Sequence, residues 1–328
     1  LHAQAEGLDL WDRDVKRYIY SNKIPLFNPL DDYLDHLPEW DGKDHIRALA
    51  DTVPTSSKLW RNHFYRWFLG LVAQWKQMSS VYANSVLPLL VGEQGCGKST
   101  WCRNLLPPVL RDFYTDSIDF GNRRDAELML HRFALINIDE FDSVGASRQS
   151  FLKHLLQKPE VNTRKPYKSS VRVLKRYAGF VGTCNNMDLL SDPTGSRRFL
   201  CVEIKGEIDR RYLVDHDQLY AQAIYLLRAG ERYWFTHEEE LAVTRQNEAF
   251  EQVPVEEQLL LQYFRAVPVG EDGGDWLSVA EIMQHIRKRS RLSFSNTTIN
   301  GFGRLLRRNN YPSRHALRGN LYHVEEIG

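Results

Sequence analysis

The amino-acid sequence predicts an α/β fold with a largely parallel sheet, a mainly helical region before it and a small separate unit after it. In residues 86–204, short β-rich runs alternate with helical ones: VLPLLV, FALINI, YAGFVGT and RRFLCVEI. This alternation is typical of parallel sheets whose strands are joined by crossover helices. Proline lacks the N–H that a central strand needs, so we place Pro88 at the start of its strand.

Helical patterns flank the predicted sheet. In residues 59–77, apolar side chains recur at three- and four-residue steps, which indicates one helix with a wide apolar face. We interpret its aromatic stripe as core packing rather than as a ligand site. The pattern is helical again in residues 209–257, and residues 267–275 form a Gly- and Asp-rich break. The predicted division is a helical region 1–80, an α/β core 81–205, a helical lid or connector 206–266 and a terminal unit 267–328.

The composition is that of an ordinary globular protein, with 42% hydrophobic and 26% charged residues. Its four cysteines lie far apart without a CxxC pair, which argues against a zinc ribbon and a disulfide framework and favours a reducing, cytoplasmic location. No stretch approaches the roughly 20 apolar residues of a membrane span, so we expect no membrane segment. The chain begins with Leu1 rather than Met, as expected of a piece of a longer protein.

Positive charge is concentrated in two segments, although the net charge is only +1. Residues 161–176 hold six Lys or Arg and no Asp or Glu, and residues 278–318 hold nine against one Glu. Each segment is a candidate contact for a polyanion.

Residues 92–99, GEQGCGKS, fit the pattern GxxxxGK[ST] between an apolar run and a helical-looking segment. The glycines let backbone N–H groups point at phosphate oxygens, aided by the positive end of the following helix. Lys98 then reaches the β- and γ-phosphates of ATP, and the Ser99 hydroxyl is a ligand of Mg²⁺. The predicted nucleotide contacts are Gly92, Gly95, Cys96, Gly97, Lys98, Ser99 and Thr100.

Residues 135–140, LINIDE, are an apolar run that ends in two adjacent carboxylates. Asp139 is expected to hold Mg²⁺ through water, and Glu140 to orient and polarise the attacking water. An isolated pair of this kind is more often a solvated turn. Together with the phosphate loop, it predicts hydrolysis of a nucleoside triphosphate.

Two further segments offer candidate catalytic groups. Asn185 and Asn186 follow the run GFVGTC, where an amide can position the water, although alone such residues more often make a turn or a helix cap. In GSRRF, residues 195–199, the guanidinium of Arg197 or Arg198 can stabilise charge on the transferring phosphoryl group, in the same or a neighbouring subunit.

The order of these segments resembles that of the virulence-associated protein E family, whose ATPase core is similar to superfamily 3 helicases and poxvirus-type primase-helicases. The resemblance covers roughly residues 28–251 and is carried most specifically by EFDSVGASRQSFLKHLLQKPEVNTRKPY and VGTCNNMDLLSDPTGSRRF. It implies an AAA+ P-loop core in which Asp139 and Glu140 are the Walker B pair and Asn185 is the sensor asparagine. Either Arg197 or Arg198 would be the arginine finger.

The same resemblance implies a DNA helicase or translocase that acts as a ring oligomer, usually a hexamer, on single-stranded DNA. Such motors are commonly encoded by phages, plasmids and pathogenicity islands, often with a primase domain fused or nearby. The sequence carries no primase motif of its own that we recognise. We therefore expect the motor part of a mobile-element or prophage primase-helicase, with a primase as a possible partner.

The first basic segment, NTRKPYKSSVRVLKRY at residues 162–177, lies where superfamily 3 motors insert a hairpin that tracks nucleic acid. Long cations neutralise phosphates and an aromatic ring stacks on a base, a combination that suits single strands. A solvated surface hairpin is the alternative. The predicted DNA contacts are Arg164, Lys165, Tyr167 and Lys168.

The second basic segment indicates a winged-helix-like domain, with a helix from Ser278, a second over about residues 296–309, and a hairpin turning near Gly319. The second helix suits a major groove of duplex DNA, and the hairpin suits the backbone. Docking to a protein is the alternative. The predicted contacts are Arg304, Arg307, Arg308 and Arg318.

Two other function classes compete with the helicase. A non-unwinding AAA+ replication initiator or loader would use ATP to remodel DNA or recruit primase, and would displace no strand. A small-molecule P-loop kinase would keep the phosphate loop but need neither GSRRF nor the basic hairpin.

Overall fold

The structure is a computed structural model that describes residues 6–7, 11–21, 23–25, 27–78, 83–164, 171–191, 196–271, 273–290, 299–316 and 319–327. The chain divides into two compact units, Leu1–Glu251 and Gln252–Gly328. This division precedes the predicted boundary at residue 267, because α11 (Val255–Tyr263) and β8 (Phe264–Ala266) contribute to the core of the second unit.

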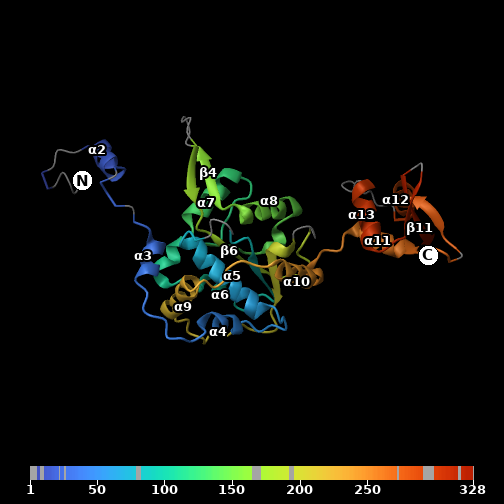
Figure 1. The fold of residues 1–328 in the computed structure, drawn as a ribbon. Helices are drawn as coiled ribbons and strands as arrows, with labels where there is room; N and C mark the ends of the chain where they lie inside the picture. Colours follow the sequence, from blue (N-terminus) through green and yellow to red (C-terminus); the bar gives the residue numbers. More distant parts are fainter. Residues whose placement is uncertain are drawn as a thin grey trace. The chain divides into compact units, whose positions relative to one another are not determined.

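A five-stranded parallel sheet lies at the centre of the first unit (Figure 1), as the alternating pattern predicted. Its order is β2–β3–β6–β1–β7, so the strand before the phosphate loop lies between β6 and β7. Pro88 is the second residue of β1, close to the predicted position. The strands are β1 (Leu87–Val91), β2 (Tyr114–Thr115), β3 (Leu135–Ile138), β6 (Gly179–Cys184) and β7 (Phe199–Glu203).

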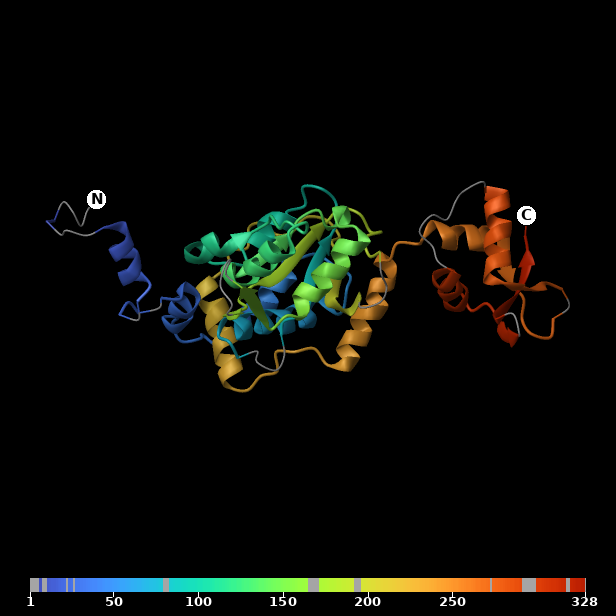
Figure 2. The same ribbon diagram turned by 90° about the horizontal axis from the view of Figure 1, so that it is seen from above.

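Helices cover both faces of the sheet (Figures 1 and 2). Along β1, Leu89 and Val91 belong to one core and Leu90 to the other, because successive side chains of a strand point to opposite faces. The Leu90 face packs against α4 (His45–Asp51), α5 (Trp60–Trp75), α6 (Lys98–Arg103) and α9 (His216–Arg228). The opposite face packs against α7 (Arg123–Arg132) and α8 (Ala146–Gln157).

The predicted aromatic helix is α5, and its stripe is core packing as expected. Trp67, Phe68 and Trp75 are fully buried. The Trp75 ring stacks on Tyr220 of α9, with centroids 5.4 Å apart and planes inclined by 17°. The helix α5 therefore holds α9 against the sheet. The position of α9 is important because the chain segment that precedes it passes beside the loop that follows β1.

The first unit contains further helices. They comprise α2 (Asp12–Ile19), α3 (Pro29–Asp35), α10 (His237–Asn247) and the 3-10 helices η1 (Pro108–Phe113), η2 (Phe141–Ser143), η3 (Ser196–Arg198) and η4 (Glu248–Phe250). All four cysteines are buried free thiols. Within the described residues, no helix combines the length and apolar character that crossing a bilayer requires.

A basic antiparallel hairpin of β4 (Glu160–Arg164) and β5 (Val171–Lys175) separates α8 from β6, as predicted. Its base pairs Glu160 with Lys175, just before the amino end of β6. The hairpin therefore starts from the edge of the sheet opposite to the carboxyl ends of the strands. Its tip, residues 165–170, lies outside the described residues.

A buried arginine anchors this hairpin. The Arg176 guanidinium donates hydrogen bonds to the carbonyls of Leu155, Leu156 and Lys158 at the end of α8, at 3.3, 2.8 and 2.9 Å. It also donates to the carbonyls of Asn84 and Ala178. Burial lowers the pKa of Arg176 to about 9. One side chain thus joins α8, β5 and the segment before β1.

The second unit contains the helices and hairpin that the tail predicted. The first predicted helix is α12 (Val279–Ser290), the second is α13 (Ile299–Arg308), and the hairpin joins β10 (Ser313–Ala316) to β11 (Gly319–Glu326). Strands β8 and β9 (Asp275–Ser278) also pair antiparallel with β11. These elements enclose a core with Ile282, Phe302 and Leu306 fully buried. Its assignment as a winged helix stays a prediction.

Candidate functional site

Residues 92–97 join the carboxyl end of β1 to α6, and each glycine of this loop has a structural reason. Gly95 and Gly97 have φ angles of +83° and +99°, in the left-handed region that other residues rarely adopt. At Gly92, a Cβ atom would lie 3.0 Å from the Cβ of Ile204. The loop therefore needs glycine for two bends and one close approach.

Lys98 is buried at the centre of the loop. Its ammonium donates hydrogen bonds to the carbonyls of Gly92 and Glu93, both at 2.7 Å. A third bond, of 3.1 Å, reaches Oδ1 of Asn185 at the end of β6. These bonds hold the ammonium between the loop and the neighbouring strand.

The two predicted carboxylates lie at the end of β3. Oδ1 of Asp139 accepts a hydrogen bond of 3.0 Å from the Ser99 hydroxyl and another from the Thr183 hydroxyl. Glu140 has a φ of +51°, which is unusual for a residue other than glycine. The chain therefore turns sharply after Asp139, and Glu140 is exposed at the strand end.

One cavity of about 300 Å³ gathers most of the predicted site at the carboxyl edge of the sheet. This edge is where parallel α/β sheets commonly bind ligands. The residues that line the cavity are Gln94, Gly95, Gly97, Lys98, Ser99, Thr100, Asp139, Glu140, Thr183, Asn185 and Arg210. Two predicted nucleotide contacts, Gly92 and Cys96, line an adjoining cavity of about 560 Å³ instead.

Three lining residues were not predicted as site residues: Gln94, Thr183 and Arg210. Gln94 lies inside the GEQGCGKS motif. Thr183 stands two residues before Asn185 in β6, and the alternation of side chains along a strand could have pointed to it. Arg210 follows β7 in a segment without a motif, and it donates a hydrogen bond to the Gly95 carbonyl. Only the three-dimensional structure brings this guanidinium to the phosphate loop.

Arg197 and Arg198 lie in η3, and neither lines the cavity of its own chain. Arg197 is about half exposed and forms an ion pair of 2.7 Å with Glu240 of α10. Arg198 is partly buried, and its burial and the neighbouring Arg197 lower its pKa. Within one chain, therefore, neither Arg197 nor Arg198 lines the cavity at the phosphate loop, and a role in a neighbouring subunit stays a prediction.

The predicted nucleic-acid contacts fall into three groups. In the second unit, Arg304 and Arg307 line a cavity of about 500 Å³ among α12, α13 and β11, whereas Arg308 does not line it. Arg164 is the last residue of β4. The others lie outside the described residues: Lys165, Tyr167, Lys168 and Arg318.

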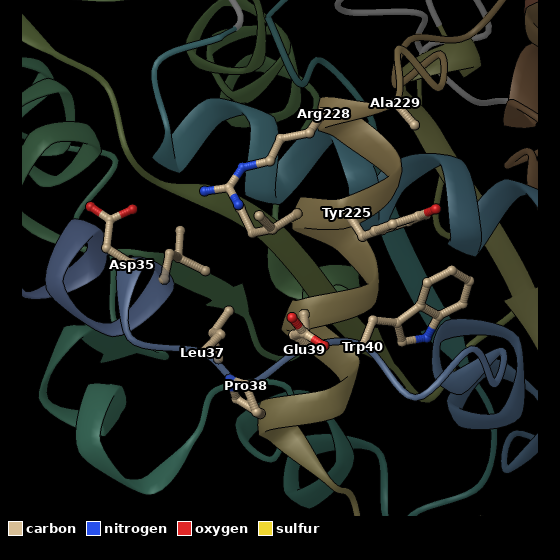
Figure 3. Close-up of a pocket in the computed structure, with 11 residues that line it drawn as sticks. Asp35, Leu37, Pro38, Glu39, Trp40, Tyr225, Arg228 and Ala229 are labelled. Atoms are coloured by element: carbon tan, nitrogen blue, oxygen red, sulfur yellow. The ribbon is translucent and has the colours of Figure 1, made fainter.

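A larger cavity, of about 680 Å³, lies between residues 34–40 and α9 (Figure 3). Trp40 and Tyr225 flank it with ring centroids 5.0 Å apart, and Arg228 reaches its rim. None of the predicted site residues lines this cavity. We therefore place the candidate site at the phosphate loop, where the chemical groups converge, rather than in the larger hollow.

A parallel α/β sheet in which a strand leads through a glycine-rich GxxxxGK[ST] loop into a helix defines the fold class of P-loop proteins. Residues 34–252 match the family model of the virulence-associated protein E-like domain. This match covers most of the chain, so the chain belongs to that family, as the motifs predicted. Residues 253–324 match a second model, a domain of unknown function from B. Theta. The two matches meet where the two units divide.

Among solved structures, the chain is similar to the apo structure of NrS-1 C terminal region (305-718). The identity is 14%, the match covers 94% of this chain and 84% of that chain, and the TM-score is 0.46. The A form apo structure of the same region matches with 14% identity, coverage of 90% and 78%, and a TM-score of 0.44. No curated protein matches the chain significantly.

Proposed function

We propose that the chain is the ATP-hydrolysing motor of a mobile-element or prophage primase-helicase, and that it moves along single-stranded DNA as a ring-shaped homo-oligomer, such as a hexamer. One observation carries the proposal. Strands β1, β3 and β6 bring an ammonium, a hydroxyl, two carboxylates and an amide into one cavity. These are the groups that the hydrolysis of a bound nucleoside triphosphate requires.

The loop suits the β- and γ-phosphates of ATP. The positive φ angles of Gly95 and Gly97 are those of a tight loop that can present backbone N–H groups to phosphate, and α6 begins there with the positive end of its dipole. The Lys98 ammonium would exchange the carbonyls of Gly92 and Glu93 for phosphate oxygens. That exchange favours binding, because a hydrogen bond between two ionised groups is stronger than one to a neutral acceptor.

Mg²⁺ fits the oxygen donors beside this loop. The Ser99 hydroxyl and the Asp139 carboxylate lie 3.0 Å apart, and both line the cavity. Oxygen ligands of this kind suit Mg²⁺, which usually keeps several waters and binds one or two carboxylates together with phosphates. Bound there, the ion would neutralise charge on the phosphates. The Thr183 hydroxyl bonds to the same carboxylate and fixes its orientation.

Glu140 and Asn185 are proposed to act on the attacking water. The Glu140 carboxylate is exposed at the cavity, where it can accept a proton from water as a general base. Asn185 lines the same cavity and is held by the Lys98 ammonium. Its amide can therefore orient a water beside the terminal phosphate.

The arginine finger is proposed to come from a neighbouring subunit of the ring. Arg197 is the better candidate, since it is more exposed than Arg198 and an ion pair with Glu240 holds its tip. In a ring, such a guanidinium can enter the next subunit's nucleotide site and stabilise charge in the transition state.

The proposed DNA contacts are the two positively charged parts of the chain. The hairpin of β4 and β5 is proposed to follow a single strand through the ring, because cations neutralise phosphates. The second unit is proposed to contact duplex DNA through Arg304 and Arg307, which share one cavity. A primase is proposed as a partner of the assembly.

A forked DNA duplex tests this function. We expect wild-type protein to assemble with ATP and Mg²⁺ and to displace one strand, and we expect Lys98→Ala to displace none. Assembly that depends on ATP without any strand displacement would favour the non-unwinding initiator or loader. A wild-type protein that binds no ATP at all would contradict both.

A further inference from the structure

A narrow cavity of about 80 Å³ adjoins the phosphate cavity. The two share three lining residues, Gly97, Thr100 and Arg210, so they are continuous around the start of α6. We call this narrow cavity the slot. Its other lining residues are Leu49, Thr52, Trp101, Ile208, Tyr212 and Val214, together with the exposed Asn104 and Asp209.

Hydrogen bonds fix the walls of the slot. After β7, the chain returns across the phosphate loop, where the Ile208 N–H donates to the Cys96 carbonyl at 3.0 Å. The Asp209 N–H donates to the Thr52 carbonyl, also at 3.0 Å. From α6, the Trp101 indole N–H donates to the Thr52 hydroxyl at 2.9 Å. Three separate segments of the chain are thereby held around one opening.

Arg210 stands at the junction of the slot and the phosphate cavity. Its guanidinium donates to the Gly95 carbonyl, and its Nε would lie 3.2 Å from a Cβ atom at Gly97. The absence of a side chain at Gly97 therefore lets this cation approach the loop. A ligand that spans both cavities must pass beside it.

The lining of the slot differs from that of the cavity on the other side of the loop. Leu49, Trp101 and Ile208 are buried apolar walls of the slot. The slot has one acidic lining residue, the exposed Asp209, whereas the cavity of about 560 Å³ is lined by three: Glu93, Glu203 and Glu207. A flat heteroaromatic ring gains by leaving water for apolar walls, whereas carboxylates would repel the adjacent phosphates.

We infer that the slot receives the base of the nucleoside triphosphate whose phosphates bind the loop, and that Arg210 contacts those phosphates at the junction. This inference rests on the proposed ATP binding and adds the residues that recognise the base. The segment 208–214 then responds directly to nucleotide, and it leads into α9.

Val214→Phe tests the slot, because a larger side chain at a lining position fills it. Leu213→Phe is the matched control, since Leu213 is 89% exposed and does not line the slot. Calorimetry with Mg²⁺ would compare ATP with inorganic tripolyphosphate, which has no base. We expect Val214→Phe to weaken ATP binding by about tenfold or more and to leave tripolyphosphate binding unchanged. Leu213→Phe should bind both ligands like wild type.

Tyr212→Ala provides a second variant should Val214→Phe fail to fold. It removes a half-buried wall of the slot, so it too should weaken ATP more than tripolyphosphate. Arg210→Ala should weaken both ligands, whereas Arg211→Ala should weaken neither, because Arg211 is exposed and lines neither cavity.

The outcomes distinguish a failure of the proposed base site from a failure of the proposed nucleotide site. If Val214→Phe and Tyr212→Ala bind ATP as tightly as wild type, the base does not bind in the slot. If Arg210→Ala binds tripolyphosphate like wild type, Arg210 is not a phosphate contact. A wild-type protein that binds neither ATP nor tripolyphosphate would instead overturn the proposed nucleotide site itself.

Discussion

At the scale of single residues, the site depends on side chains that are already held in place. Asp139 is oriented by hydroxyls from two elements, Ser99 of α6 and Thr183 of β6. Lys98 is held between the loop and Asn185. Groups fixed in this way need little reorganisation when a charged ligand arrives, which is a main source of electrostatic stabilisation in enzymes.

Glu140→Gln separates binding from hydrolysis. The amide keeps the shape of the side chain but cannot accept a proton, so we expect ATP binding near wild type and hydrolysis slower by about 100-fold or more. Calorimetry and phosphate release measure the two quantities. Asp142→Asn is the control, because Asp142 lies two residues further along and outside the cavity lining. Equal hydrolysis by Glu140→Gln and wild type would remove Glu140 from the mechanism.

The sequence predicts those site residues that belong to a recognisable local motif. The phosphate loop and the carboxylate pair follow apolar strands, and parallel strands bring such residues to one edge. Arg210 has no such context, since it reaches the loop only through the path of the chain after β7. Arg197 or Arg198 was expected to reach a phosphoryl group of the same or a neighbouring subunit, which stays a prediction. The ion pair of Arg197 with Glu240 depends on how α10 packs on η3, which no local pattern encodes.

At the scale of elements, Arg176 secures the base of the basic hairpin. Its guanidinium donates to the carbonyls of Leu155, Leu156 and Lys158 at the end of α8, where helix carbonyls run short of backbone donors. The sequence marked Arg176 only as part of a basic run. Its burial could not be predicted, because the partners are backbone carbonyls that carry no sequence signal.

Arg176→Ala should therefore destabilise the first unit. Several buried carbonyls would lose their donor, so we expect the free energy of unfolding to fall by about 3 kcal/mol. Lys175→Ala, at the exposed neighbouring position, is the control and should change little. Urea unfolding measures both. A loss of stability no greater than that of the control would contradict the anchoring role.

Elements with a strong internal pattern were predicted, and elements that depend on distant partners were not. The helix α5 is marked by its apolar period, and its aromatic residues form the core as expected. Strand β2 has only two residues and is defined by its pairing with β3. Likewise, α11 continues a helical stretch of sequence, but Leu259 and Leu260 turn toward the core of the second unit.

At the scale of the whole molecule, the candidate site and the basic hairpin lie at opposite strand ends of one sheet. Strand β6 connects them, with Arg176 just before its amino end and Asn185 just after its carboxyl end. Its six residues span about 20 Å. Under the proposed function, β6 would therefore be a direct structural link between nucleotide hydrolysis and DNA contact.

Mixed assemblies test whether Arg197 acts between subunits. Lys98→Ala lacks a working nucleotide site but keeps the finger, and Arg197→Ala has the opposite defect. If the finger acts in a neighbouring subunit, a mixture of the two inactive proteins should hydrolyse ATP, because some interfaces combine both intact parts. A mixture no more active than the separate proteins would show that Arg197 does not stabilise the transition state in a neighbouring subunit.

The rate of ATP hydrolysis with and without single-stranded DNA tests the central claim most directly. Wild-type protein should hydrolyse ATP faster when single-stranded DNA is present, and Lys98→Ala should be inactive in both conditions. Hydrolysis that persists in Lys98→Ala, or a wild-type rate that DNA does not change, would contradict a DNA-translocating motor built on this phosphate loop.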